Sequence, residues 1–216
     1  SINESFFDVI DSEEKAYVLG LFYADGFNNE KDGRIVISLH IKDRYLLEKV
    51  RQIMNSEGPL IIPNGKNMCI FQVSSKRLSI RLTQLGCMQA KSLILKFPSS
   101  NIVPEHLFHH FLRGSFDGDG HMGIVRKNNQ LRWCMIGSCD FINGLQNKII
   151  SLFGLTGQNI KKENVRELIY AGNKQASKIS EFMYKNATIF MKRKYNNYVH
   201  CRMQYDENMK LIPREK

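Results

Sequence analysis

The segments Val18-Leu-Gly-Leu-Phe-Tyr-Ala-Asp-Gly26 and Leu112-Arg-Gly-Ser-Phe-Asp-Gly-Asp-Gly120 repeat one another within a chain of 216 residues. In each segment, two small residues stand four positions apart and are followed by an aspartate and a glycine. Four residues make about one turn of an α-helix, so each small pair leaves a bare stripe on one helix face. A face without side-chain bulk lets two helix backbones approach closely. We therefore predict that the segments pack on each other through Gly20 and Ala24, and Gly114 and Gly118.

This packing would place Asp25 and Asp119 side by side at the same end of the helix pair. Two ionised carboxylates at close range repel each other, and a divalent cation is the usual means of keeping both ionised. The sequence therefore predicts a metal site with Asp25 and Asp119 among its ligands.

The charge balance predicts a polyanionic partner. There are 31 Lys and Arg residues against 21 Asp and Glu residues, so the formal net charge is +10. A surplus of this kind is typical of proteins that bind nucleic acid. Otherwise the composition is ordinary, with 43% hydrophobic and 24% charged residues, and favours a globular protein with a substantial core.

The cysteines favour a reducing compartment. They are odd in number and form no Cys-x-x-Cys pair, which speaks against a disulfide framework and against cysteine-ligated zinc. We find no secretory signal pattern and no apolar run long enough to span a bilayer. We therefore expect a soluble intracellular protein, in the cytoplasm, the nucleoid or an organelle. The cysteines are Cys69, Cys87, Cys134, Cys139 and Cys201.

The residues around the second motif repeat the order of those around the first. Hydrophobic periodicity and turn residues predict three helices and several strands in each half. In the first half the helices are expected at 12–25, 43–54 and 75–85, and the strands at 34–41, 60–62 and 68–73. In the second half the helices are expected at 104–119, at 141–153 and from Asn173, where this residue would be the N-cap, and the strands at 121–126, 131–136, 159–162 and 166–170.

We interpret each half as helix, two strands, helix, two strands, helix. The two aspartates are 94 residues apart (119 − 25), which is the length expected of a duplicated unit. The chain then divides into an N-terminal half, a linker, a C-terminal half and a basic extension that has no counterpart and forms a final helix or arm. These parts are 1–86, 87–103, 104–187 and 188–216.

Together, the two motifs, their spacing and the repeated elements resemble a LAGLIDADG homing endonuclease of the single-chain type, which carries two motif copies. The first copy departs from the pattern at Tyr23, where Asp117 stands in the second. We expect this departure to affect packing rather than chemistry. The resemblance implies an α+β fold of two αββαββα halves related by a pseudo-twofold axis. Eight strands in antiparallel sheets would form a saddle that straddles duplex DNA.

The resemblance also implies an activity. It is that of a monomeric, site-specific double-strand DNA endonuclease, active in intron homing, which cuts one phosphodiester on each strand and leaves short 3′ overhangs. The cofactor would be Mg²⁺, for which Mn²⁺ can substitute, bound by Asp25, Asp119 and phosphate oxygens. The backbone carbonyls of Ala24 and Gly118 would be further metal ligands.

Polar residues outside the motifs complete the expected site. Lys76 and Lys174 hold similar places after the last strand of each half, and His40 lies near the end of the 34–41 strand. By the resemblance, such residues orient the attacking water or screen phosphate charge. Strands in a major groove present basic side chains to bases and phosphates. The expected DNA-binding residues are Arg34, Lys66, Arg126, Lys127, Arg132, Lys161, Lys162, Arg166, Lys192, Arg193 and Lys194.

Two other interpretations remain open. The same fold could serve a non-cleaving binder, either an RNA maturase that assists intron splicing or a transcription factor. The chain could also be a nuclease module excised from an intein, although it lacks an N-terminal Cys and a terminal His-Asn. The intact pair Asp25 and Asp119 favours the nuclease, because a pure binder does not need both acids. The target sequence and the host cannot be inferred from these residues.

Overall fold

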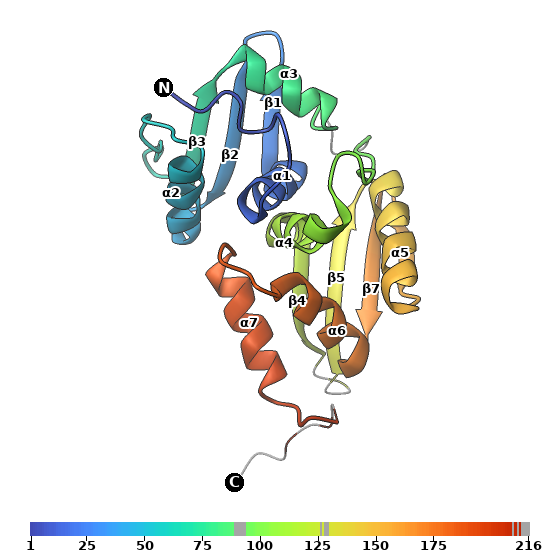
Figure 1. Ribbon diagram of the computed structural model, residues 1–216. Helices are drawn as coiled ribbons and strands as arrows, with labels where there is room; N and C mark the ends of the chain where they lie inside the picture. Colours follow the sequence, from blue (N-terminus) through green and yellow to red (C-terminus); the bar gives the residue numbers. More distant parts are fainter. Residues whose placement is uncertain (89–93, 126, 128–129, 209, 211, 213–216) are drawn as a thin grey trace.

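Helices α1 (Glu13–Asp25) and α4 (Phe108–Asp119) lie side by side at the centre of the molecule (Figure 1). The computed structural model describes residues 1–216 except 89–93, 126, 128–129, 209, 211 and 213–216. Helix α1 begins where the Ser12 hydroxyl accepts the backbone N–H of Lys15, at 3.3 Å. All eight residues from 16 to 23 are buried, which is expected of a helix surrounded by protein on every side.

The two central helices approach to backbone contact at their glycines. A Cβ placed on Gly20 would lie 2.1 Å from the carbonyl oxygen of Phe111, and one on Gly114 would lie 2.1 Å from that of Tyr17. The Ser115 hydroxyl donates to the Gly20 carbonyl, at 3.2 Å. Only residues without a side chain fit at these two positions.

The remaining elements form one sheet and its helices in each half. The first half contains β1 (Gly26–Asn29), β2 (Arg34–His40), α2 (Arg44–Ile53), β3 (Met68–Ser74) and α3 (Lys76–Gln84). The second contains β4 (Gly120–Val125), β5 (Gln130–Gly137), α5 (Cys139–Phe153), β6 (Gln158–Lys162), β7 (Val165–Ala171) and α6 (Asn173–Tyr184). Helix α7 (Lys192–Arg202) follows the second half.

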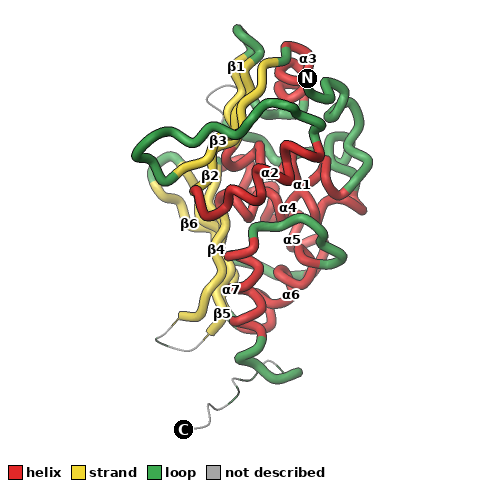
Figure 2. The backbone as a smooth tube through the Cα atoms, turned by 90° about the vertical axis from the view of Figure 1, so that its left-hand side faces the viewer, coloured by secondary structure: helices red, strands yellow, loops and turns green. Residues whose placement is uncertain are grey.

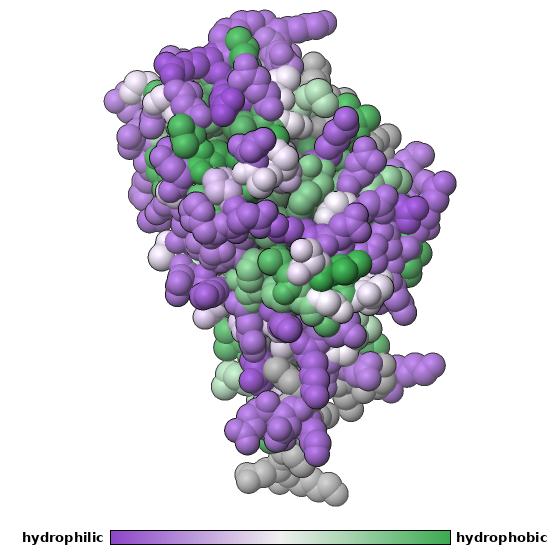
Figure 3. Space-filling model, turned by 45° about the vertical axis from the view of Figure 1, so that its right-hand side comes forward, coloured by the Kyte–Doolittle hydropathy of each residue, from purple (hydrophilic) through white to green (hydrophobic). Residues whose placement is uncertain are grey.

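Both sheets are antiparallel, with strand orders β1-β2-β3 and β4-β5-β7-β6. Figure 2 shows the strands of both sheets along one side of the molecule and the helices on the other. Antiparallel sheets covered on one side by helices make this an α+β fold, as the sequence predicts. Hydrophilic residues cover most of the face seen in Figure 3. Within the described part of the chain, no helix combines the length and apolar character that a membrane span requires.

The first sheet differs from the expected four strands. Residues 60–62 make only an isolated bridge, in which Ile61 and Ile70 exchange two backbone hydrogen bonds of 2.9 Å. Pro59 and Pro63 flank this segment and lack the N–H groups that a longer ladder would use. The described residues therefore form seven strands, not eight. The short strand β1 was not located from the sequence, because two of its four residues are asparagines.

The position at which the motifs differ serves the same purpose in both halves. The Tyr23 hydroxyl donates to the Leu85 carbonyl at 2.5 Å and so holds the end of the first half. Its counterpart Asp117 accepts the backbone N–H of Met191 at 2.7 Å and the Tyr17 hydroxyl at 2.6 Å. Both side chains therefore anchor the chain that leaves their half.

Asp43, Ser75 and Asn173 each stand where a helix was expected to begin, and they differ in how they meet it. Asp43 is the N-cap residue of α2 but makes no side-chain capping hydrogen bond. The Ser75 hydroxyl accepts the Leu78 N–H at 3.3 Å and caps α3, as expected. Asn173 is not the N-cap of α6, because Gly172 occupies that position and the Asn173 amide oxygen instead accepts the Leu131 N–H at 2.9 Å. This hydrogen bond ties α6 to β5, a tertiary contact that local sequence does not encode.

Candidate active site and nucleic-acid interface

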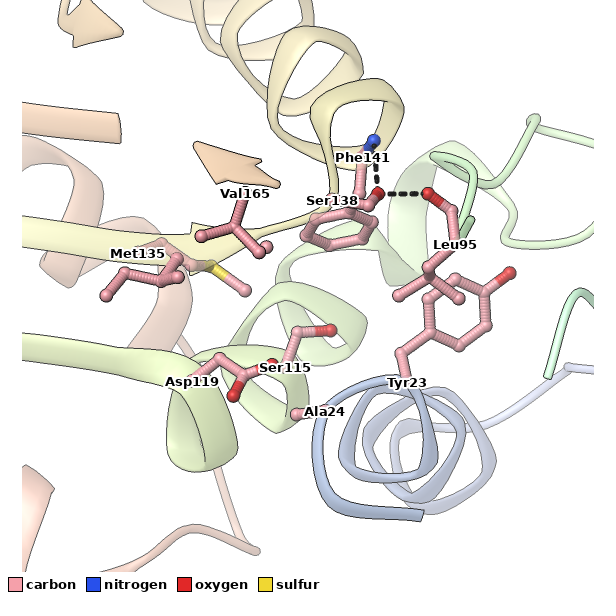
Figure 4. Close-up of a pocket in the computed structure, with 11 residues that line it drawn as sticks. Tyr23, Ala24, Leu95, Ser115, Asp119, Met135, Ser138, Phe141 and Val165 are labelled. Carbon is pink, nitrogen blue, oxygen red and sulfur yellow. Dashed lines mark hydrogen bonds between the residues drawn. The ribbon is translucent and has the colours of Figure 1, made fainter. Parts of the chain in front are cut away.

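The last residues of the central helices are Asp25 and Asp119, and they end at the same place. A Cβ placed on Gly118 would lie 2.8 Å from Asp25 Oδ2 and 2.2 Å from the Ala24 Cβ. The Asp25 carboxylate therefore lies against the Gly118 backbone, one residue before Asp119. Asp25 is half-buried and Asp119 is exposed. Figure 4 shows Asp119 at the end of α4, beside Ala24 at the end of α1.

This donor set fits a hard divalent cation. It consists of two carboxylates and nearby backbone carbonyls, all oxygen donors. In the described ranges, no group of three or more His, Cys, Asp or Glu side chains is placed to hold a metal ion. Mg²⁺ commonly binds one or two carboxylates and completes its shell with waters and substrate phosphates. A site of this composition suits Mg²⁺ better than zinc, which favours nitrogen and sulfur ligands.

A lysine from outside the repeated halves also enters this site. The Lys194 ammonium, on α7, donates to the carbonyls of Phe116 at 2.7 Å, Gly118 at 3.2 Å and Gly120 at 2.7 Å. Burial lowers the pKa of Lys194 to about 8, although nearby carboxylates, including Asp25, act in the opposite direction. The sequence placed Lys194 in a basic run only, because its position depends on how an unrepeated segment folds back.

The other three predicted catalytic residues lie at the end of β2 and at the starts of α3 and α6. The Lys76 ammonium, at the start of α3, donates to the carbonyls of Glu30 and Lys31 in the β1–β2 turn, at 2.9 Å for Glu30. His40 ends β2, three residues beyond the Ile37 that pairs with Gly26, and its Nδ1 accepts the Lys42 N–H at 3.1 Å. Lys174 is exposed near the start of α6. Their catalytic roles remain predictions.

A cavity of about 150 Å³ lies beside Asp119, between the ends of the central helices and the second sheet. Ser138 lines it, donating its hydroxyl to the Leu95 carbonyl and accepting the Phe141 N–H at 3.1 Å (Figure 4). Leu95 belongs to the segment expected as the linker, so this contact joins that residue to the second half next to the acid pair.

The strand register decides which basic residues face away from the helices. In the second sheet, Trp133 and Tyr170 are paired and buried toward α4, so residues of the opposite parity point outward. Arg132 and Lys162 are on this outer face, where both form ion pairs with Glu167, at 3.3 Å for Arg132. In the first sheet, Arg34 is exposed and has the parity opposite to the buried Ile35.

Two predicted DNA-binding residues lie on the other face. Arg166 pairs with Lys161 across β7 and β6, and Arg166 shares its parity with the buried Tyr170. Its guanidinium donates to Asn159 at 3.0 Å, and Asn159 in turn donates to α5. Residues alternate between the two faces of a strand, so Arg166 and the exposed Lys161 lie on the face opposite to Arg132 and Lys162. A role for them in DNA binding stays a prediction that this register does not favour. Arg126 lies outside the described residues.

The other expected DNA-binding residues lie in turns or on α7. Lys66 and Lys127 are exposed in turns. The Lys192 ammonium lies 4.6 Å from the centre of the Tyr45 ring, and the Arg193 guanidinium contacts the buried carboxylate of Asp43 at 2.9 Å. The basic run of α7 therefore ties the extension to the first half, in addition to any contact with a partner.

Comparison with known proteins agrees with this geometry. Residues 12–60 match the family model described as a LAGLIDADG-like domain. A search of curated proteins finds no match. The LAGLIDADG homing endonuclease I-LtrWI, solved bound to target DNA, is similar with a TM-score of 0.60 and 13% identity, over 92% of this chain and 99% of that one. The meganuclease I-AabMI, bound to uncleaved DNA, has a TM-score of 0.60 and 16% identity, over 87% and 89%.

A third similar structure is the meganuclease I-SmaMI bound to DNA, with a TM-score of 0.58 and 14% identity, over 88% of this chain and 90% of that one. The expected resemblance to single-chain LAGLIDADG homing endonucleases is thus confirmed in the fold of most of the chain and in the sequence around the first motif.

Proposed function

We propose that this protein is a monomeric, site-specific double-strand DNA endonuclease that requires a divalent metal ion. One observation carries the proposal: Asp25 and Asp119 end two helices that meet at the centre of the molecule, between two sheets that face the same side. A duplex laid along the strands would bring both backbones near these acids. The similar structures that are bound to DNA support this arrangement.

The outer strand faces would bind the duplex. A β-sheet or β-ribbon can enter the major groove and present alternate side chains to base edges and phosphates. Arg34, Arg132 and Lys162 are on these faces, and Lys66 and Lys127 extend from turns beside them. We propose that these residues bind DNA, and we leave out Lys161 and Arg166 because the register turns them toward the helices.

The acid pair would hold the metal ion. Asp25 and Asp119 would be its carboxylate ligands, with the carbonyls of Ala24 and Gly118 nearby. Bound there, Mg²⁺ or Mn²⁺ would neutralise phosphate charge and help ionise an attacking water. The two carboxylates would hold the ion, and the close contact of α1 with α4 would fix their separation. Lys76, Lys174 and His40 would assist by screening phosphate charge, and the products would carry short 3′ overhangs.

We further propose that the units expected from the sequence are functional ones. Residues 1–86 and 104–187 would each serve one DNA strand, with 87–103 as the linker. In the extension, 188–216, helix α7 would have a structural role, because it contacts both halves. A role in intron homing is consistent with a cleavage site of this kind.

Incubation with a randomised duplex library and Mg²⁺, followed by sequencing of the cut ends, tests the proposal. We expect cleavage at a restricted set of sequences. Asp25→Asn and Asp119→Asn should each abolish cleavage and leave DNA binding within a few-fold. The Asp140→Asn variant, at an exposed position in the first turn of α5, controls for loss of one negative charge. Sequence-specific binding without cleavage in the unaltered protein would favour a maturase or transcription factor instead.

A further inference from the structure

The Lys194 ammonium donates hydrogen bonds to carbonyl oxygens at the C-terminal end of α4 and in the first residue of β4. An ammonium group has three N–H donors, and here they reach three carbonyls, those of Phe116, Gly118 and Gly120, at 2.7–3.2 Å. The last carbonyls of a helix have no partner within the helix and carry partial negative charge. The lysine therefore neutralises an end of α4 that already bears Asp119.

One of these carbonyls is also an expected metal ligand. A divalent ion bound to the Gly118 oxygen would be roughly 5 Å or less from the Lys194 nitrogen, given the ligand distances of Mg²⁺. Two cations this close repel strongly where water is partly excluded. The ammonium and the metal ion cannot both be held at this oxygen without a large loss of affinity for one of them.

The lysine has room to leave. A cavity of about 550 Å³ opens between α7 and β4, and it is lined by Lys194 itself and by Gly118, Gly120 and His121. The cavity is wide enough for the side chain to swing away and for a hydrated ion to reach the carbonyls. The rest of α7 stays attached, through Arg193 to Asp43 and through the Asn197 amide to the Met122 carbonyl.

We propose that Lys194 and a divalent cation compete for the Gly118 carbonyl, so that Lys194 is a built-in counter-ion of the acid pair in the metal-free protein. This inference rests on the metal site of the proposed function. It makes the two halves inequivalent, because the cation that competes comes from an extension found only after the second half. Lys194 is thus a positioning residue that tunes metal affinity, and it need not touch DNA.

Titration of the DNA-free protein with Mn²⁺ tests the competition. Electron paramagnetic resonance measures the concentration of free ion at each step. We expect Lys194→Met to bind Mn²⁺ at least about tenfold more tightly than the unaltered protein. Lys194→Arg should not show this gain. Lys192→Met, which removes a charge from the same helix over the Tyr45 ring, is the matched control and should change affinity little.

A second measurement uses the unaltered protein and does not depend on how a variant folds. Reductive methylation followed by peptide mass spectrometry should label Lys194 faster when Mn²⁺ is present. Unchanged or slower labelling with bound Mn²⁺, or no gain in affinity in Lys194→Met, overturns the inference.

The outcomes separate this inference from the proposed function. If the protein binds Mn²⁺ and Asp25→Asn abolishes binding, but Lys194→Met has no effect, only the competition is wrong. If neither the unaltered protein nor Lys194→Met binds Mn²⁺ without DNA, the competition is wrong, and cleavage by the unaltered protein compared with Asp25→Asn decides the proposed function separately.

Discussion

Single residues decide how closely the two halves meet. Gly20 and Gly114 could be identified from sequence because a repeated small-xxx-small pattern has few other structural uses, and each glycine contacts the opposite backbone. The register of the outer faces could not be identified in the same way. It depends on cross-strand pairing, which a single sequence does not specify. The sequence alone therefore does not tell which of Lys161 and Lys162 is on the outer face.

Gly114→Ala should destabilise the protein by about 3 kcal/mol or more, because overpacking against rigid backbone cannot relax by a change of rotamer. The new Cβ would meet the Tyr17 carbonyl oxygen at 2.1 Å. Guanidinium unfolding followed by circular dichroism measures the loss. Gly58→Ala is the matched control, since its Cβ would have no atom nearer than 3.9 Å. Equal stability of the two variants would contradict the close contact.

Asp117 makes a prediction about pH. Burial raises the pKa of its carboxyl to about 6, despite the hydrogen bond from Tyr17. Below about pH 4, the pKa in the unfolded state, the carboxyl is neutral in both states and its ionisation costs no stability. Because the folded pKa is raised, the free energy of unfolding falls as pH rises from there through 6. Ionised Asp117 should therefore cost about 3 kcal/mol at neutral pH.

Asp117→Asn should remove this cost. Its amide oxygen can still accept from Tyr17 and Met191, and its amide nitrogen replaces Oδ1, an oxygen with no hydrogen-bond partner in the described structure. Urea unfolding at several pH values should show the variant gaining stability over the unaltered protein between pH 4 and pH 7. A stability difference that does not change with pH would refute the buried ionisation.

At the scale of elements, caps and periodicity were enough to place most helices. Helix α1 begins after Ser12 and α3 after Ser75, close to where helices were expected to begin, and each serine hydroxyl caps its helix. Elements that rely on tertiary contacts were not predictable. Residues 60–62 form a bridge rather than a strand. The extension could be expected only as a helix or an arm, because contacts with both halves position α7.

The segment that leads into α7 is held by one carboxylate of α1. Glu13 accepts the Thr188 N–H at 2.7 Å, the Thr188 hydroxyl at 2.9 Å, the Ile189 N–H at 3.2 Å and the buried Arg113 guanidinium at 2.7 Å. Burial raises the pKa of Glu13, but the bonds from Thr188 and the charge of Arg113 outweigh it and the net pKa is lowered. This contribution to stability is present above the unfolded value and is lost as pH falls through the folded one.

Glu13→Gln should cost about 3 kcal/mol, because it leaves the buried Arg113 without its counter-charge. It should also loosen the extension, so that limited proteolysis cuts the 185–191 segment earlier than in the unaltered protein. Glu14→Gln, the neighbouring residue of the same helical turn, is the control. If cleavage of this segment were unchanged while stability fell, Glu13 would stabilise the core without anchoring the extension.

At the scale of the whole molecule, the net charge of +10 predicts DNA affinity that falls steeply with added salt, because each neutralised phosphate releases counterions. The position of a charge matters as well as its sign. Lys162 and Lys161 are neighbours on β6, yet the first faces outward with Arg132 and the second faces the helices with Arg166.

Lys162→Gln and Lys161→Gln remove the same charge from adjacent positions, so comparing them isolates the face of the sheet. We expect Lys162→Gln to weaken binding to a random-sequence duplex and to reduce the slope of log affinity against log salt by about 0.9, the value for one lost phosphate contact. Lys161→Gln should leave that slope nearly unchanged. Fluorescence anisotropy over a range of salt concentrations measures both. Equal slopes for the two variants would mean that DNA affinity depends only on the net charge of the protein. A larger effect of Lys161→Gln would place the DNA on the opposite face of the sheet.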